Sequence, residues 1–312
     1  MYMSRVINNY IQSPLNYTGG KYKLLPQILP LFPQDINSFV DVFCGGGNVG
    51  INVNCKQVVF NDIDKNVIGI LKLFKKVPIN KLVCDIMRII NEYNLSIVCD
   101  HGYEYYNCNS STGLGNYNKQ PFLNLREHFN TLKRKDKNYY IHLYILIIYA
   151  FNNQIRFNSK GEYNLPVGKR DFNSDMQIKL KNFVVKLQEK MCTFVSHDFR
   201  YFTSQKLTPQ DFVYADPPYL ITCATYNENE GWNIQKEKCL YKYLDSLNEH
   251  HIRFALSNVL SSKGKTNEIL KAWLNEHVGD YVCHHLDYNY SNSSYHTIDR
   301  NTGSDEVLVT NY

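Results

Sequence analysis

Hydrophobic and polar positions near the start of the chain fall into blocks that are typical of strands followed by helices. The segment NSFVDVF, residues 37–43, predicts a strand, followed by a glycine-rich turn and a helix that opens at Val49. Residues 56–62, KQVVFND, predict a second strand, and the apolar positions across residues 65–74 predict a helix packed on a sheet. Because strands and helices alternate, we expect a doubly wound, Rossmann-like α/β fold.

This alternation stops in the middle of the chain. Residues 107–119, NCNSSTGLGNYNK, are polar and show no period, whereas the apolar run at residues 139–151 predicts a buried helix. Short β-like runs resume after Met191 and continue to the closing EVLVTNY. We therefore expect the α/β core to comprise residues 1–75 and 178–312, with a mainly helical domain inserted at residues 76–177.

Composition adds little that is specific. With 44% hydrophobic and 20% charged residues the chain is an ordinary globular protein, and its net charge of +5 suits a polyanionic partner without demonstrating one. The nine cysteines form no C-x-x-C pair and no Cys/His cluster at zinc spacing, so we expect reduced thiols and no metal. No secretory signal and no apolar run of roughly 20 residues is present, which favours a cytoplasmic protein without a membrane segment.

A glycine motif follows the first predicted strand. In DVFCGGGNVG, Gly45, Gly47 and Gly50 satisfy G-x-G-x-x-G, which allows a tight turn and close approach of a ligand to a helix N-terminus. A turn without a ligand is one alternative, and a nicotinamide or flavin dinucleotide is another, supported by Asp62, 17 residues after Gly45. Asp41 decides between the ligands, because a carboxylate in a normally apolar central strand needs a polar partner. The cationic amino group of S-adenosylmethionine (AdoMet) would suit it, and we place AdoMet ahead of NAD.

A second motif, DFVYADPPYL, delivers Asp216, Pro217, Pro218 and Tyr219 at the end of a predicted strand, where open α/β sheets bind ligands. An ionised aspartate and a proline carbonyl only accept hydrogen bonds, so the motif fits a ligand that donates two hydrogens, such as an exocyclic amine. Two acceptors can turn the amine's lone pair towards an electrophilic methyl group, and Tyr219 offers a flat face for a base. An ordinary proline turn is the alternative, which the match at a strand end makes improbable.

These motifs resemble the DNA adenine N6-methyltransferases of the Dam type, the D12 class or alpha group of amino-methyltransferases, over nearly the whole chain. The family opens with an aromatic-x-Gly-Gly-Lys segment, matched by Tyr17 and Lys21, although the best-known members carry Trp in place of Tyr17. Its D-x-F-x-G-x-G motif and the acidic residue after the second strand are matched as well. The resemblance implies an AdoMet site made by Tyr17, Lys21, Asp41, Phe43, Gly45, Gly47, Asp62 and Asp198.

The same resemblance extends into the insertion. Residues 152–168, NNQIRFNSKGEYNLPVG, are similar to the family's target-recognition stretch, which implies that Arg156 reads bases and Asn152 contacts the duplex. A surface arginine that touches only phosphate, or nothing, is the alternative. A basic patch comes shortly before, at Lys133, Arg134, Lys135 and Lys137. This patch would bind DNA phosphates, and the alternative is a solvated loop without a ligand.

Our hypothesis is therefore an enzyme that transfers a methyl group from AdoMet to N6 of a flipped-out adenine in a specific double-stranded DNA sequence. We expect a monomer on DNA that protects a host from a restriction endonuclease acting on the same sequence, a partner in function and not in physical contact. The alternatives are an N4-cytosine DNA methyltransferase, a nicotinamide-dependent oxidoreductase, and a DNA-binding protein that retains the fold without catalysis.

Overall fold

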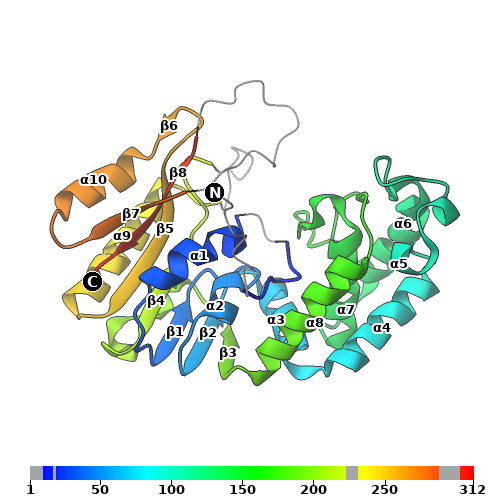
Figure 1. The fold of residues 1–312 in the computed structure, drawn as a ribbon, viewed down its shortest axis with the longest axis horizontal. Helices are drawn as coiled ribbons and strands as arrows, with labels where there is room; N and C mark the ends of the chain where they lie inside the picture. Colours follow the sequence, from blue (N-terminus) through cyan, green and yellow to red (C-terminus); the bar gives the residue numbers. More distant parts are fainter. Residues whose placement is uncertain (1–9, 17–18, 223–230, 288–302) are drawn as a thin grey trace, which may run out of the picture. The chain divides into compact units, whose positions relative to one another are not determined.

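The short apolar runs of the chain form one sheet with the order β3-β2-β1-β4-β5-β8-β7, and β6 pairs with β5 (Figure 1). The computed structural model describes residues 10–16, 19–222, 231–287 and 303–312. Strands β1 to β5 pair in parallel, whereas β8 runs antiparallel to both β5 and β7. The strands are β1 (Ser38–Asp41), β2 (Gln57–Asn61), β3 (Cys192–Val195), β4 (Phe212–Ala215), β5 (Arg253–Ser262), β6 (Lys265–Thr266), β7 (Val282–Leu286) and β8 (Asp305–Thr310).

The sheet changes direction of growth between β1 and β4. From β1 the chain builds outward through β2 and β3, and from β4 it builds the other way through β5. Such a reversal leaves a crevice at the carboxyl ends of the two central strands, which is the usual ligand position in doubly wound folds. Asp41 is the last residue of β1, and Asp216 follows β4 directly. The topology therefore brings the two predicted motifs to the same edge of the sheet.

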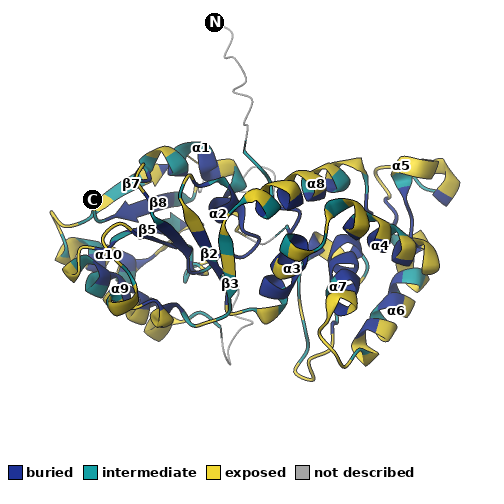
Figure 2. Ribbon diagram, turned by 90° about the horizontal axis from the view of Figure 1, so that it is seen from below, coloured by how far each residue is buried: buried dark blue, intermediate teal, exposed yellow. Residues whose placement is uncertain are grey.

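Both faces of the sheet are covered, which explains why its central strands are apolar at successive positions. On one face Val40, Val213 and Phe254 pack in a cluster with residues of α9 (Ile234–Glu249) and α10 (Glu268–Glu276). The alternate residues Phe39 and Phe212 contact the ring of Phe32, at centroid distances of 5.8 and 4.9 Å, on the other face. In Figure 2, β5 and β8 are coloured as buried along most of their length.

The remaining helices of this unit are short and lie at strand ends. Pro26 and Pro30 fall in the first turns of α1 and η2, where proline lacks only an N–H that would have no helical partner. The unit comprises residues 21–63 and 191–312 together with 1–10. Its short helices are η1 (Lys21–Leu24), α1 (Leu25–Ile28), η2 (Leu29–Leu31), α2 (Asn48–Asn52), η5 (Phe199–Tyr201) and η6 (Ser204–Lys206).

The second unit is helical and comprises residues 11–20 and 64–190. Its centre is α7, whose residues Tyr139 and 141–149 are all buried, because a helix that is hydrophobic all round packs on every side. Asp136 caps α7 by accepting from the backbone N–H groups of Asn138 and Tyr139, at 3.0 and 3.2 Å. The helices are α3 (Lys65–Lys76), α4 (Ile79–Glu92), α5 (Val98–His101), η3 (Glu104–Tyr106), α6 (Gly115–Thr131), α7 (Lys137–Tyr149), η4 (Phe151–Asn153) and α8 (Ser174–Glu189).

The predicted fold class is confirmed: a doubly wound α/β sheet carries a mainly helical insertion, which lies between β2 and β3. The helical unit begins at residue 64 and ends at residue 190, whereas the pattern placed the insertion at 76–177. Helix α6 begins at Gly115, inside the stretch expected to be irregular. In the described ranges no helix combines the length and the apolar character needed to cross a membrane.

Candidate active site and DNA interface

Asp41 is an almost fully buried carboxylate, 1% exposed, at the carboxyl end of β1. Within the described part of the chain its Oδ1 atom has no hydrogen-bond partner. Burial raises the pKa of Asp41 well above its usual range and the charges of Asp216 and Asp62 raise it further, against backbone N–H groups of Gly50 and Phe43 that lower it. Buried polar atoms without a partner are rare in native proteins, which makes this carboxyl group a candidate contact for a ligand.

The glycine loop after β1 is held by Asp62. The backbone N–H of Gly45 donates to Asp62 Oδ2 at 2.9 Å. Gly45 and Gly47 adopt φ values of +47° and +78°, which side-chain-bearing residues rarely take, and Gly47 is the N-cap of α2. A Cβ on Gly50 would lie 2.4 Å from the ring of Phe60, so the third glycine lets α2 pack on β2. Each glycine of the motif therefore has a separate structural reason.

The acceptor motif after β4 contains a buried ion pair. Lys21 Nζ lies 2.9 Å from Asp216 Oδ1, and the exposed fractions of the two side chains are 4% and 17%. The ammonium group also lies 4.8 Å from the centre of the Tyr219 ring. Burial raises the pKa of Asp216, while the positive charge of Lys21 and its hydrogen bond lower it. Pro217 is buried and Pro218 is exposed.

Two further residues of the predicted cofactor site, Phe43 and Asp198, contact neighbouring side chains. Phe43 packs against Phe199 and Trp232, with centroid distances of 5.6 and 5.5 Å. Asp198 caps η5 and forms a two-pronged pair with Arg200, at 2.7 and 3.0 Å, which lowers the pKa of Asp198. Tyr17 lies outside the described residues.

Two groups at this edge were not indicated by the sequence pattern. Trp232 completes the aromatic wall beside Phe43, and its indole N–H donates to Glu237. Glu306, 2% exposed, accepts a 3.4 Å hydrogen bond from the hydroxyl of Tyr219. The signal that could have found Glu306 is a carboxylate in an otherwise apolar closing strand, the same signal that singled out Asp41.

The helical unit presents the predicted DNA-binding residues on a small hairpin and a loop. Residues Phe157 and Tyr163 form an antiparallel bridge, and Asn130 of α6 fixes Tyr163 through both backbone groups, at 2.8 and 3.2 Å. At the base of this hairpin Arg156 is exposed, and its Nε donates to Asn164 Oδ1 at 2.9 Å. Asn152 is also exposed and has a φ of +55°. The guanidinium of Arg156 is thus held in one orientation before any ligand binds.

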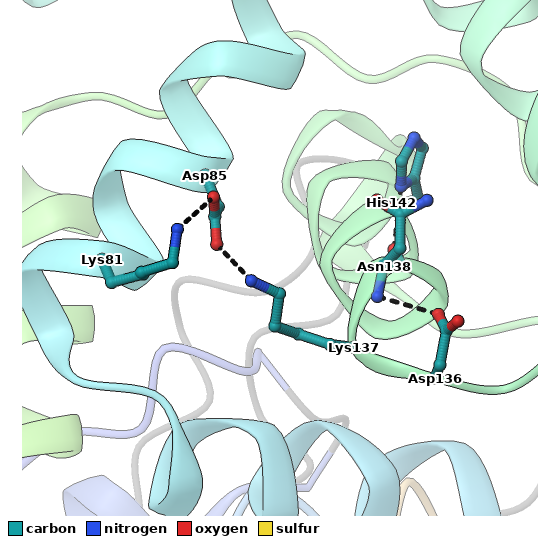
Figure 3. Close-up of polar contacts among 6 residues, drawn as sticks. All are labelled: Lys81, Asp85, Asp136, Lys137, Asn138 and His142. Carbon is teal, nitrogen blue, oxygen red and sulfur yellow. Dashed lines mark hydrogen bonds and ion pairs between the residues drawn. The ribbon is translucent and has the colours of Figure 1, made fainter.

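The basic patch divides into two pairs. Lys137 Nζ lies 2.7 Å from Asp85, which Lys81 also contacts at 3.3 Å (Figure 3). Lys135 donates to Asn66 at 3.2 Å. Lys133 and Arg134 are exposed, and their side chains make no hydrogen bond or ion pair within the described part of the chain. Only the first two basic residues therefore remain available to an anion.

Fold and site together define an α/β protein with a candidate ligand site at the switch point of a doubly wound sheet. A family model for D12 class N6 adenine-specific DNA methyltransferases matches residues 17–291, and the chain belongs to that family. The resemblance inferred from the motifs is thereby confirmed, and the nicotinamide-dependent alternative is set aside. Among the described residues no group of His, Cys, Asp and Glu side chains is arranged to hold a metal ion.

Curated relatives include modification enzymes. The chain is 43% identical to the modification methylase StsI of Streptococcus sanguinis over 309 residues, 97% of this chain. It is also 43% identical to the type II methyltransferase M.FokI of Planomicrobium okeanokoites over 311 residues, 98% of this chain. In both cases it spans 43% of the relative's length. The type II methyltransferase M1.LlaDCHI of Lactococcus lactis subsp. cremoris is 26% identical, with 95% of this chain and 94% of that protein aligned.

Proposed function

We propose that this chain transfers a methyl group from AdoMet to the N6 amine of adenine in a specific double-stranded DNA sequence, as the modification enzyme of a type II restriction-modification system. Support comes from family membership and from relatives described as modification methylases and type II methyltransferases. The observation that carries the proposal is the placement of Asp41 and Asp216 at the switch point. Asp41 has a buried oxygen without a partner among the described residues, and Asp216 is followed by Pro217, whose carbonyl can only accept hydrogen bonds.

The residues present fit AdoMet. The unpartnered oxygen of Asp41 would pair with the cationic amino group of the methionine moiety, beside a glycine loop that Asp62 holds in place. Phe43, Phe199 and Trp232 supply an apolar aromatic wall of the kind that adenine rings contact. AdoMet supplies an electrophilic methyl group when it is bound. The adenine contact of Asp198 rests on the family resemblance alone. In the structure Arg200 donates hydrogen bonds to both carboxylate oxygens of Asp198.

The chain's own residues would act on the target amine. Asp216, when ionised, and the Pro217 carbonyl accept the two amine hydrogens and turn the nitrogen lone pair out of the ring. Burial raises the pKa of Asp216, and the positive charge and hydrogen bond of Lys21 oppose this effect and so favour the ionised form. Tyr219 would stack on the flipped base, a contact that contributes about 1–3 kcal/mol and offsets part of the few kcal/mol that flipping costs.

The helical unit would recognise DNA. Lys133 and Arg134 would neutralise phosphates, and Arg156, which Asn164 holds in place, would read base edges beside Asn152. We propose that the protein acts as a monomer. The corresponding restriction endonuclease would recognise the same DNA sequence but would not bind to this protein.

The test is transfer of labelled methyl from AdoMet to DNA from a host without methylases, followed by mapping of the modified bases. We expect methyladenine confined to one short motif. Label on cytosine would overturn the assignment of the base. Binding of AdoMet and DNA without any transfer would leave a non-catalytic DNA-binding protein.

The Asp216→Ala variant should lower the transfer rate by about 100- to 1,000-fold, the effect typical of removing one group that acts on the reacting atoms. Asp35→Ala is the matched control, because Asp35 also pairs with a cation in the same unit but is 80% exposed. Circular dichroism should show that both variants are folded. A transfer rate for Asp216→Ala equal to that of the control would refute the role given to Asp216.

A further inference from the structure

Glu306 occupies a position where a buried strand normally carries an apolar side chain. All residues of β8 from Glu306 to Thr310 are buried, and Glu306 itself is 2% exposed. In the sheet it pairs in register with Val259 of β5 and with Leu286 of β7. A carboxylate in such surroundings is costly, and departures from the local pattern of this kind concentrate at functional sites.

The direction of β8 explains where this carboxylate lies. Because β8 is antiparallel to β5, its first residues pair with the last residues of β5, as in the pair Asp305 and Ser261. Glu306 is therefore at the carboxyl edge of the parallel strands, where β4 delivers Asp216 and Tyr219. A single reversed strand brings a residue from the end of the chain to the acceptor motif.

The contacts of Glu306 lead to the proposed catalytic motif. The hydroxyl of Tyr219 donates to Glu306 Oε2 at 3.4 Å. This hydroxyl is the end of the side chain farthest from the backbone, so the hydrogen bond restrains the free end of the ring. Lys21 lies 4.8 Å from the centre of the same ring and 2.9 Å from Asp216. The ring is thus held at its hydroxyl by Glu306 and faced by a cation, with Asp216 as the other charged neighbour.

We propose that Glu306 is a positioning residue for methyl transfer: it holds the Tyr219 hydroxyl and so fixes the ring on which the flipped adenine stacks. This inference rests on the proposed function. It gives the closing segment EVLVTNY a role beyond that of a sheet strand. Glu306 acts through Tyr219 and touches no reacting atom, so its removal should affect placement of the base more than binding of AdoMet.

The test compares Glu306→Ala, Glu306→Gln and Tyr219→Phe in the full chain. Loss of either partner of the hydrogen bond should lower kcat about 10- to 100-fold, the cost of a misplaced reacting group, while the KM for AdoMet stays near that of the wild type. The double variant Glu306→Ala/Tyr219→Phe should be no slower than the slower single variant, because both changes remove the same Tyr219–Glu306 hydrogen bond. The glutamine variant keeps an acceptor oxygen and should restore most of the lost rate.

A second readout separates positioning from general damage. In a duplex with 2-aminopurine at the mapped target adenine, fluorescence should rise on binding of the wild-type protein and rise less with Glu306→Ala. Thr310→Val, which alters a fully buried polar residue at the other end of β8, is the matched control and should leave both readouts unchanged.

Each outcome is decisive for one of the two claims. Absence of methyl transfer by the wild-type protein overturns the proposed function. Transfer by the wild type together with a wild-type kcat and fluorescence change in Glu306→Ala overturns the role of Glu306 alone. An equal loss in Glu306→Ala and Thr310→Val, without rescue by glutamine, would make Glu306 a structural residue and also overturns the inference.

Discussion

Asp41 is a residue whose burial costs the fold stability and whose proposed role is to bind AdoMet. Its Oδ1 is buried without a partner among the described residues, and two further carboxylates raise its pKa. Because the pKa of Asp41 is raised in the folded state, the folded protein holds this proton more tightly than the unfolded chain. Stability is therefore lost as the pH rises from the ordinary aspartate range through the raised pKa.

We expect Asp41→Asn to raise the free energy of unfolding at neutral pH by about 1–3 kcal/mol, because a neutral amide removes the carboxylate charge that burial and two neighbouring carboxylates disfavour. The gain should shrink towards pH 4, where the aspartate of the wild type is protonated. The same variant should lose AdoMet binding. Thermal melts over a pH series and calorimetric titration with AdoMet check the two effects, and lower stability at pH 7 would contradict the account.

Lys21 should control the acid side of the activity profile. It lowers the pKa of Asp216, which in the proposed mechanism accepts from the target amine in its ionised form. Without the cation, nothing from Lys21 opposes the effect of burial, so the pKa of Asp216 should be higher in Lys21→Met than in the wild type. We expect the acid limb of kcat to move to higher pH in pre-steady-state assays. Lys23→Met, an exposed lysine in the same short helix, is the control and should keep the wild-type profile.

At this scale the sequence indicated candidate site residues but not the side chains that they contact. Asp41 and Asp216 were indicated by charge in an apolar strand and by a rare motif. The pairing of Lys21 with Asp216 joins positions 195 residues apart, which no local pattern can show. The pairing of Asp198 with Arg200 is local, yet the sequence alone does not distinguish it from a free carboxylate.

Among the elements, the loop between α6 and α7 has the most direct consequence for DNA binding. The Lys137–Asp85 ion pair and the Asp136 cap fix the start of α7, and so define where Lys133 and Arg134 project. The four basic residues look equivalent in the sequence. In the structure two of them hold the unit together and two are available to phosphates.

Lys133→Ala/Arg134→Ala should therefore reduce the slope of log K against log salt concentration by about 1.8, since each phosphate contact contributes about 0.9. Lys135→Ala/Lys137→Ala removes the same charge and should mainly lower the melting temperature, because the contacts with Asn66 and Asp85 are lost. Binding isotherms at several salt concentrations give the slopes. Equal slopes for the two variants would show that both pairs of basic residues contribute equally to DNA binding, and would contradict this prediction.

Elements with strong patterns were predicted, and those without were not. Strands β1 and β4 are buried at every position and β2 at most positions, so their apolar runs were unambiguous. Helix α6 contains Pro121 and many polar side chains, and only a few of its residues are buried. Its apolar stripe is narrow because it packs on one side of α7, and such a stripe is difficult to distinguish from a loop in a single sequence.

At the scale of the whole molecule, the sheet is assembled from two distant parts of the chain. Phe39 of β1 pairs with Phe212 of β4, and the helical unit occupies most of the sequence between them. The alternation of predicted elements located both parts. It could not set the limits of the insertion, because α3 and α8 belong by their packing to the helical unit although α3 has the pattern of a helix covering a sheet.

This discontinuity also sets the order in which a ribosome delivers the pieces. The residues that pair in β1 and β4 are 173 positions apart, so at about 5–20 residues per second on the order of 10–35 s separate their synthesis. During that interval the edge of β1 that β4 will cover is an open template for other chains. The helical unit, complete at residue 190, is finished before that edge closes. The nascent chain is thus most prone to aggregate before it is complete, and chaperones that bind exposed strands on the ribosome are the remedy for a poor yield.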